Sequence, residues 1–318
     1  MVIRRYRPTD LPGLVAVWNA ALANTPNFLR LTEADLRRRA VEVPSFGNTE
    51  LLVAEQSGDI LGFVHLGQGS TLWDNTAARG VDRAEGHIYA LVAPERDRSL
   101  MEALLEAALA RLAESGARRA LLTPSWVQGT QPFYNGIAGA YEIPGLSPTR
   151  RNLVEVAEAM GFREACWYAT PMLDAADQAH LDALFAEADR IGAQARRWGL
   201  GVQARTIESP FFPPRRLVEV VQGRRPVACA ACGLWEEYAR ERGRRLFAIT
   251  SVQVTPAWRR RGLAKLACIR ALQAGLQEGA EGFHLHVYRD NQAAWNLYHQ
   301  ALGFRPAQLW VTLSRPLP

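Results

Sequence analysis

The sequence predicts an α/β protein made of two related units in tandem. The chain has 318 residues, and one hydrophobic core rarely extends beyond about 250–300 residues, so two domains are expected. The same order of predicted elements (a hairpin, a strand, a long helix and another strand) occurs once in each half. A Gly-Phe pair also lies near the end of each half, at Gly161-Phe162 and at Gly303-Phe304. We therefore expect an internal repeat, with domains at residues 1–172 and 173–318.

Local patterns place the elements of the first half. An early strand is followed by a helix that Thr9 or Asp10 is suited to cap. Ser57-Gly58-Asp59 separates two apolar runs, which is a hairpin signal. The predicted strands are Val2–Tyr6, Leu51–Glu55, Ile60–Leu66, His87–Val92 and Ala120–Thr123, and the predicted helices are Leu11–Leu22 and Leu100–Ser115.

The second half begins with an Ala-rich amphipathic helix, followed by a Pro-rich loop at residues 210–216. Gly223-Arg224-Arg225 then separates the strands of a second hairpin. The predicted helices are Ala175–Arg197, Leu263–Glu278 and Gln292–Leu302, and the predicted strands are Leu217–Gln222, Val227–Ala231, Phe247–Val254 and Phe283–Tyr288.

The composition argues against several classes of protein. The net charge of +5 is mild and the basic residues fall in short clusters, so no nucleic-acid-binding arm is expected. No apolar run approaches the roughly 18–20 residues of a membrane helix, and the first ten residues show no apolar signal region. Cys229 and Cys232 form a lone CxxC in a strand-like run, so we expect no metal site. This cysteine usage favours a reduced, cytoplasmic protein.

One segment, Ser251–Ala267, carries most of the chemical information. A predicted strand ends just before Pro256, which ends any ladder pairing because it lacks an N–H. The arginines at 259–261 and Gly262 follow, where the next helix begins. The first N–H groups of a helix have no internal partner and lie at the positive end of its dipole. Because a glycine lets the backbone approach a phosphate closely, the segment predicts a helix start that binds a pyrophosphate.

This pattern resembles a family motif. The run Val254-x-Pro256-x-x-Arg259-x-x-Gly262-x-Ala264 resembles the acetyl-CoA-binding motif (Q/R)xxGx(G/A) of the GNAT superfamily of N-acetyltransferases. Asn291-x-x-Ala294-x-x-Leu297-Tyr298, followed by Gly303-Phe304, resembles the second motif of that family. The resemblance implies two tandem GNAT-like domains, each a mixed, mostly antiparallel sheet flanked by helices. The tandem layout is similar in architecture to the mycothiol synthase type.

The resemblance also implies roles for particular residues. The strand end would pair its backbone with the pantetheine arm of acetyl-CoA, and the following turn would hold the pyrophosphate with backbone N–H groups. Tyr298 would be the general acid that protonates the departing thiolate, because the two groups have similar basicity. The implied cofactor-binding residues are Val252, Gln253, Val254, Arg259, Arg260, Arg261, Gly262, Leu263, Ala264 and Asn291.

The general base stays open. In many relatives it is a carboxylate on the strand before the phosphate-binding turn, and the strand Phe247–Val254 has none. His284 and His286 share one face of the next predicted strand and are suited to relay a proton, although a histidine on a sheet face is more often structural. The remaining candidates are Glu219, Glu236 and Glu237.

The first half lacks the residues of both motifs. Aligning the halves on Val92-x-Pro94 and Val254-x-Pro256, and again on the two Gly-Phe pairs, places bulky or acidic residues where the motifs need others. We therefore expect the first half to be a GNAT fold without a cofactor site. The aligned pairs are Leu100 with Gly262, Glu102 with Ala264, Thr149 with Asn291 and Val156 with Tyr298.

The first half also contains extra chain. Pro94 to Gly161 spans 67 positions and Pro256 to Gly303 spans 47, so the first half has 20 more. The excess falls in residues 125–148, which are rich in aromatics, Gly and Pro. This segment either lines an acceptor pocket or packs against the neighbouring domain. Its residues of interest are Trp126, Tyr134 and Tyr141.

These observations predict an N-acetyltransferase that moves acetyl from acetyl-CoA to a primary amine of a small metabolite. Two alternatives stay open: acetylation of a protein or peptide, and a regulatory protein that binds acyl-CoA without turnover. The sequence leaves the oligomeric state undetermined.

Overall fold

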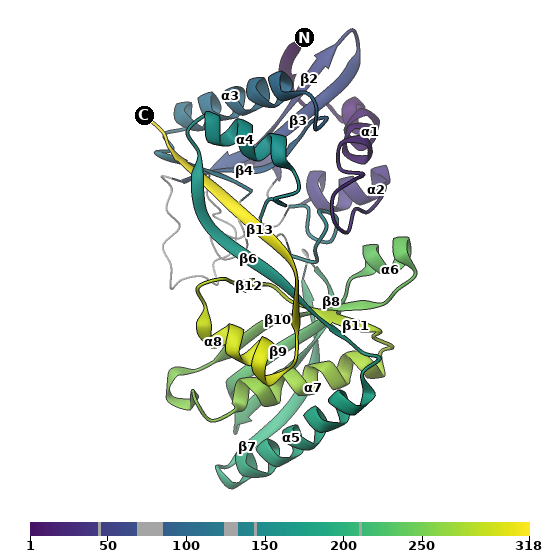
Figure 1. The fold of residues 1–318 in the computed structure, drawn as a ribbon, viewed down its shortest axis with the longest axis vertical. Helices are drawn as coiled ribbons and strands as arrows, with labels where there is room; N and C mark the ends of the chain where they lie inside the picture. Colours follow the sequence, from purple (N-terminus) through teal and green to yellow (C-terminus); the bar gives the residue numbers. More distant parts are fainter. Residues whose placement is uncertain (44–45, 69–84, 124–132, 143–144, 210–211) are drawn as a thin grey trace. The chain divides into compact units, whose positions relative to one another are not determined.

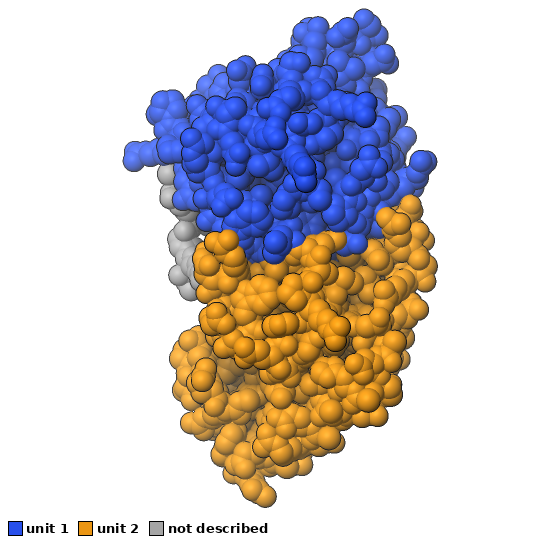
Figure 2. Space-filling model, in the orientation of Figure 1, with its two compact units in different colours: residues 1–168, 309–318 blue, residues 169–308 orange. Residues whose placement is uncertain are grey.

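The structure is a computed structural model that describes residues 1–43, 46–68, 85–123, 133–142, 145–209 and 212–318. It divides into two compact units, shown in different colours in Figure 2. Unit 1 comprises residues 1–168 and 309–318, and unit 2 comprises residues 169–308. The sequence placed the division at 172–173 and assigned the whole C-terminus to the second domain, so the return of the last ten residues to unit 1 is new.

Unit 1 contains a sheet in the order β1-β2-β3-β4-β5-β13, in which only the β4–β5 pair is parallel. Helices α1 and α3 pack against its strands (Figure 1). The elements are β1 (Val2–Arg5), α1 (Leu11–Ala21), α2 (Glu33–Leu36), β2 (Thr49–Gln56), β3 (Asp59–Gln68), β4 (Glu85–Val92), α3 (Arg98–Glu114), β5 (Arg119–Leu122), α4 (Arg151–Ala159) and the end of β13 (Arg305–Pro316).

The alternation of β3 separates the two faces of this sheet. Val64 and Leu66 belong to the core that α3 covers. Phe63 and His65 project to the opposite side, where Phe63 stacks with Trp18 of α1 and His65 contacts a cluster of aromatic rings. Both faces of the strand are buried, as expected of a sheet with helices or loops on each side.

Unit 2 contains a sheet in the order β6-β11-β10-β9-β8-β7, in which only the β10–β11 pair is parallel. Helices α5 and α7 pack on each other, and α7 covers β8, β9 and β10 (Figure 1). The elements are the end of β6 (Arg163–Asp174), α5 (Gln178–Arg197), β7 (Leu200–Ser209), β8 (Phe212–Gln222), β9 (Arg225–Leu234), α6 (Glu236–Arg242), β10 (Leu246–Val254), α7 (Leu263–Gln277), β11 (Gly282–His284), β12 (Val287–Tyr288) and α8 (Gln292–Trp295).

Each half of the chain gives its last strand to the sheet of the other unit. Strand β6 follows α4 in sequence, yet its end pairs with β11 in unit 2. Strand β13 ends the second half, yet its last residues pair with β5 in unit 1. This exchange explains why the last ten residues belong to unit 1.

Three local predictions need correction. The predicted strand at 283–288 is broken into β11 and β12, and the predicted helix at 292–302 is the short α8 followed by a π-helical turn, Asn296–Ala301. The Pro-rich segment at 210–216 is not wholly a loop, because β8 begins at Phe212. Pro213 and Pro214 are tolerated there because pairing with β9 begins only at Arg216. No helix in the described ranges combines the length and the apolar character needed to cross a membrane.

Candidate functional site

Strand β10 changes character at a bulge. Its pairing with β9 shifts by one residue between Thr250 and Gln253, and Ser251 there has a φ of 55°. The strand is buried up to Thr250, and the residues after it are exposed or half-buried. A bulge of this kind ends regular pairing and redirects the side chains that follow. The predicted pantetheine-binding residues Val252, Gln253 and Val254 are the ones that this bulge carries out of the core.

The same strand end has a free backbone edge. Strand β10 pairs with β11 only through Leu246–Ala248, so within the described ranges no strand covers the following residues on that side. The carbonyl of Val254 accepts from Arg259 Nε at 3.3 Å. An extended amide-containing ligand could therefore add to this edge as a further strand would.

The turn between β10 and α7 exposes a row of backbone amides. Gly262 is the N-cap of α7 with a φ of 77°, and Arg260 also has a positive φ, of 63°. No described side chain caps the helix, and the N–H groups of residues 260–265 have no acceptor among the described residues. The N–H of Arg259 differs, because it donates to the Pro256 carbonyl. The free amides therefore begin at Arg260, and an uncapped helix start of this kind is suited to an anion. The diphosphate site stays a prediction.

The side chains around this turn are basic and exposed. Arg261 lies over the ring of Trp258 with its guanidinium carbon 4.7 Å from the centroid, and 5.5 Å from that of Trp198. Such cation–π contacts hold the guanidinium in place without neutralising its charge. Arg259, Arg260 and Arg261 are all exposed in this turn, so they place positive charge near the free amides, which would suit a pyrophosphate.

The two residues of the second motif sit at the two ends of one helical segment. Asn291 caps α8, since its Oδ1 accepts from the N–H of Ala294 at 3.1 Å, which leaves its NH2 group for a ligand. Tyr298 lies in the π-helical turn after α8, is 8% exposed and packs edge-on against Phe304. Single π-turns often mark functional positions in helices. The roles assigned to both residues stay predictions.

Three of the candidate bases, His284, His286 and Glu219, have lowered pKa values, which makes them weaker bases. Burial lowers the pKa of His284 to about 3, and burial together with His284 lowers that of His286, so both rings are neutral at pH 7. His284 stacks on Trp235, and His286 Nδ1 lies 2.9 Å from Thr170 Oγ1. Glu219 is hydrogen-bonded to Arg205, which lowers the pKa of that carboxyl. None of them is an obvious base.

Unit 1 has the same strand bulge but a closed helix start. Pairing of β3 with β4 shifts between His65 and Leu66, which places the bulge of β4 at the position equivalent to that of β10. Helix α3, however, begins at Arg98, three residues earlier in the repeat than α7. Its N-cap Asp97 accepts from the N–H of Leu100 at 3.0 Å, so a carboxylate already fills the anion position. Leu100, which aligns with Gly262, is buried, so Asp97 is the residue that closes this helix start.

The extra segment of the first half lies partly outside the described residues, which include neither Trp126 nor the rest of 124–132. Tyr134 and Tyr141 are both buried. Tyr134 Oη lies 3.0 Å from His65 Nδ1, and its ring stacks on Trp18. Tyr134 also lines a pocket inside unit 1. That the segment lines an acceptor pocket stays a prediction.

The sequence was compared with protein families and with curated proteins. Residues 181–304 match the sequence model of the Acetyltransferase (GNAT) family. A search of curated proteins found no match to the sequence.

Three solved structures share the fold over nearly the whole chain. The GCN5-related glucosamine N-acetyltransferase region of a fungal multi-domain GH3 β-N-acetylglucosaminidase has a TM-score of 0.69 at 16% identity, over 98% of this chain and 38% of that longer one. A tandem GNAT protein from the clavulanic acid biosynthesis pathway has a TM-score of 0.66 at 13% identity, over 99% of this chain and 98% of that one. A GCN5-related N-acetyltransferase from Sphaerobacter thermophilus has a TM-score of 0.56 at 13% identity, covering 100% and 96%. The predicted tandem fold is confirmed.

Proposed function

We propose that this chain, a GNAT acetyltransferase of tandem architecture, transfers the acetyl group of acetyl-CoA to a primary amine of a small metabolite. The observation that carries the proposal is the row of backbone amides without protein acceptors at the start of α7, beside the open edge of β10. A helix start that is neither capped nor paired is suited to a pyrophosphate.

The residues of unit 2 divide the binding work. The amides of residues 260–264 would hold the diphosphate, and the arginines around them would neutralise its charge. The backbone of Val252–Val254 would pair with the amides of the pantetheine arm, and the Asn291 NH2 group would donate to it. When bound, acetyl-CoA supplies the acetyl group and a thiolate leaving group.

Two proton movements are required of the protein. Tyr298, a buried residue, would donate its phenolic proton to the departing thiolate, whose basicity is similar. The attacking amine must also lose a proton, and the group that accepts it stays unassigned, because burial holds the pKa of both His284 and His286 low.

We take a small metabolite as the acceptor class. Acetylation of a peptide remains the alternative acceptor class. A regulatory acyl-CoA-binding protein is the alternative without catalysis, and the absence of a carboxylate on β10 supports it.

The test measures CoA thiol release with a panel of small amines and, in parallel, with peptides. We expect turnover with a small amine, and a Tyr298→Phe variant that loses about 100-fold or more in kcat while its Kd for acetyl-CoA is unchanged. Tyr238→Phe, a second tyrosine of unit 2, is the matched control and should retain activity. Acetyl-CoA binding without turnover on any acceptor would favour the regulatory alternative, and failure to bind acetyl-CoA would refute the proposal.

A further inference from the structure

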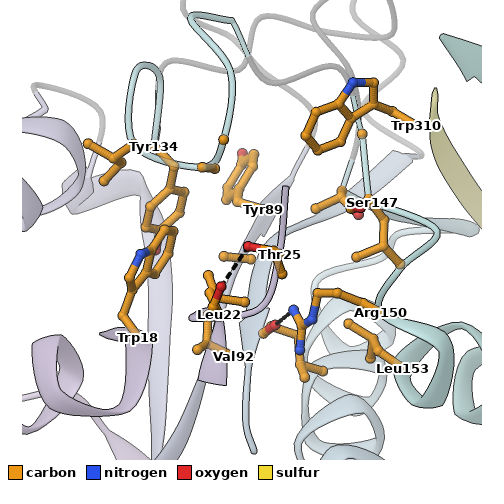
Figure 3. Close-up of a pocket in the computed structure, with 18 of the residues that line it drawn as sticks. Trp18, Leu22, Thr25, Tyr89, Val92, Tyr134, Ser147, Arg150, Leu153 and Trp310 are labelled. Carbon is orange, nitrogen blue, oxygen red and sulfur yellow. Dashed lines mark hydrogen bonds between the residues drawn. The ribbon is translucent and has the colours of Figure 1, made fainter. Parts of the chain in front are cut away.

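Unit 1 contains a pocket that is separate from the site described above. It has a cavity volume of about 70 Å³ and lies between β4, β5, α1 and the segment that precedes α4 (Figure 3). Its walls are mostly apolar. The aromatic lining residues are Trp18, Phe28, Tyr89, Tyr134 and Trp310, and the larger aliphatic ones are Leu22, Leu91, Val92, Leu122, Ile137, Leu146 and Leu153.

The separation of two parallel strands creates the space. Strands β4 and β5 pair only as far as Ile88 and Leu122, and the N–H of Thr123 bonds the Ile88 carbonyl at the last shared position. Beyond that point β4 continues through Val92 paired with β3 but no longer with β5. The extra segment of the first half closes the gap, since Gly139 and Gly145 line it with positive φ values and approach other backbone closely.

Several buried donors of residues that line the pocket have no acceptor among the described residues. They are the indole N–H of Trp18, the hydroxyl of Thr123, and Nε and Nη2 of Arg150. All of these groups can donate a hydrogen bond, and no Asp or Glu lines the pocket. Burying a polar group without a partner is costly, so unmatched donors in one cavity indicate an acceptor from outside the protein.

Arg150 is the dominant group of the set. It is 7% exposed, and Figure 3 shows its guanidinium directed between the walls, where Nη1 donates to the Leu91 carbonyl at 2.8 Å. Glu95 lies outside the pocket with a carboxylate oxygen 3.7 Å from Nε, too far for a hydrogen bond. Burial lowers the pKa of Arg150 to about 10, so the group remains charged at neutral pH. Glu95 thus forms an ion pair with Arg150 but leaves Nε and Nη2 without a hydrogen-bond acceptor in the described part of the chain, so these two groups can still donate to an anion.

We propose that this pocket binds a small carboxylic acid with an apolar body, its carboxylate on Arg150 and its body between Trp18 and Trp310. The donors match carboxylate oxygens, and the walls match an aromatic or branched aliphatic group. The volume corresponds to about five water molecules, which suits a ligand of roughly five to ten non-hydrogen atoms.

The pocket is not a second cofactor site. Asp97 caps α3, where a diphosphate would bind, and Arg150 occupies the Leu91 carbonyl on the strand edge where a pantetheine arm would pair. The inference concerns unit 1 alone and holds whether or not the proposed acetyl transfer is correct.

The test titrates the full-length protein by calorimetry with benzoate, benzyl alcohol and benzylamine, which share one ring and differ in charge. We expect benzoate to bind with a Kd on the order of 100 µM, benzyl alcohol at least about tenfold more weakly, and benzylamine not at all. Isovalerate repeats the test with an aliphatic body. Equal binding of benzoate and benzyl alcohol, or no heat with either carboxylate at about 10 mM, would overturn the proposal.

Variants then locate the site. Arg150→Met keeps apolar volume and removes the donors, and should weaken benzoate at least about tenfold while acetyl-CoA binding is unchanged. Arg96→Met, an exposed arginine near by in sequence, is the control and should bind benzoate as the natural protein does. If Arg150→Met does not fold, Trp18→Phe and Thr123→Val each remove one donor and should weaken benzoate by about threefold or more. Unchanged affinity in those variants would place benzoate elsewhere.

Discussion

Helices α7 and α3 both begin after a Val-x-Pro strand end, with a similar bulge in the strand before them. They differ in whether the first backbone N–H groups of the helix have a hydrogen-bond acceptor. In unit 2, two residues before the helix, Arg260 and Gly262, have positive φ angles. In unit 1 the helix begins three residues earlier in the repeat, and Asp97 bonds its first turn. An extra helical turn and a cap therefore replace the anion site.

The edges of β10 and β4 also differ in whether their backbone groups have partners within the protein. The edge of β10 beyond Ala248 has no covering strand in the described ranges, while on β4 the Arg150 side chain bonds the Leu91 carbonyl. Unit 1 thus satisfies internally the groups that unit 2 leaves for a ligand. A capped helix start is the more stable one, by about 1 kcal/mol for a good N-cap residue. The proposed binding at the start of α7 would require that no side chain caps this helix, so unit 2 would lack the stability that such a cap gives.

The largest expected effect comes from giving unit 2 the cap of unit 1. Gly262→Asp would place a carboxylate at the N-cap of α7, where it can accept from the first-turn amides and repel the diphosphate. We expect acetyl-CoA affinity to fall by about 100-fold or more, roughly 3 kcal/mol, in a calorimetric titration.

Gly262→Asn is the matched control, because Asn also tolerates positive φ and caps helices but carries no charge. It should lose much less affinity, about tenfold at most. If the Asp and Asn variants bind acetyl-CoA alike, the anion site does not lie at this helix start.

A smaller effect is expected from acid. Burial lowers the pKa of His65 in unit 1, and of His284 in unit 2, to about 3. The unfolded chain has a histidine pKa near 6.5, so between about pH 6.5 and 3 only the unfolded state takes up these protons. Stability therefore falls as the pH decreases through that window, by about 2 kcal/mol per histidine between pH 7.5 and pH 5.

Unit 2 should lose more than unit 1, because the pKa of His286 is lowered as well. Urea denaturation at pH 7.5 and pH 5 measures the loss. His284→Phe keeps a ring against Trp235 and should reduce the difference between the two pH values. If His284→Phe loses as much unfolding free energy between pH 7.5 and pH 5 as the natural protein does, His284 is already protonated in the folded protein at pH 5.

The sequence predicted what depends on local pattern. Hairpins at Ser57-Gly58 and at Gly223 follow from turn chemistry, and the open turn follows from Gly262 after the strand end. The exchange of β6 and β13 was not predictable, because pairing between distant strands leaves no local signal. The cap on α3 did leave one, since Asp97 is a preferred N-cap residue three positions before Leu100.

The smallest expected effect comes from removing that cap. Asp97→Ala should lower the free energy of unfolding by about 1 kcal/mol, because one helix-start amide loses its acceptor and the dipole loses a favourable charge. Asp97→Asn keeps the acceptor and should cost less. Calorimetry should still show one acetyl-CoA per chain, since the extra turn of α3 remains and Arg150 still occupies the strand edge. If Asp97→Ala binds a second acetyl-CoA, the Asp97 cap alone prevents binding at the start of α3. The turn geometry around Gly262 would then matter less for binding than the absence of a negative charge at the helix start.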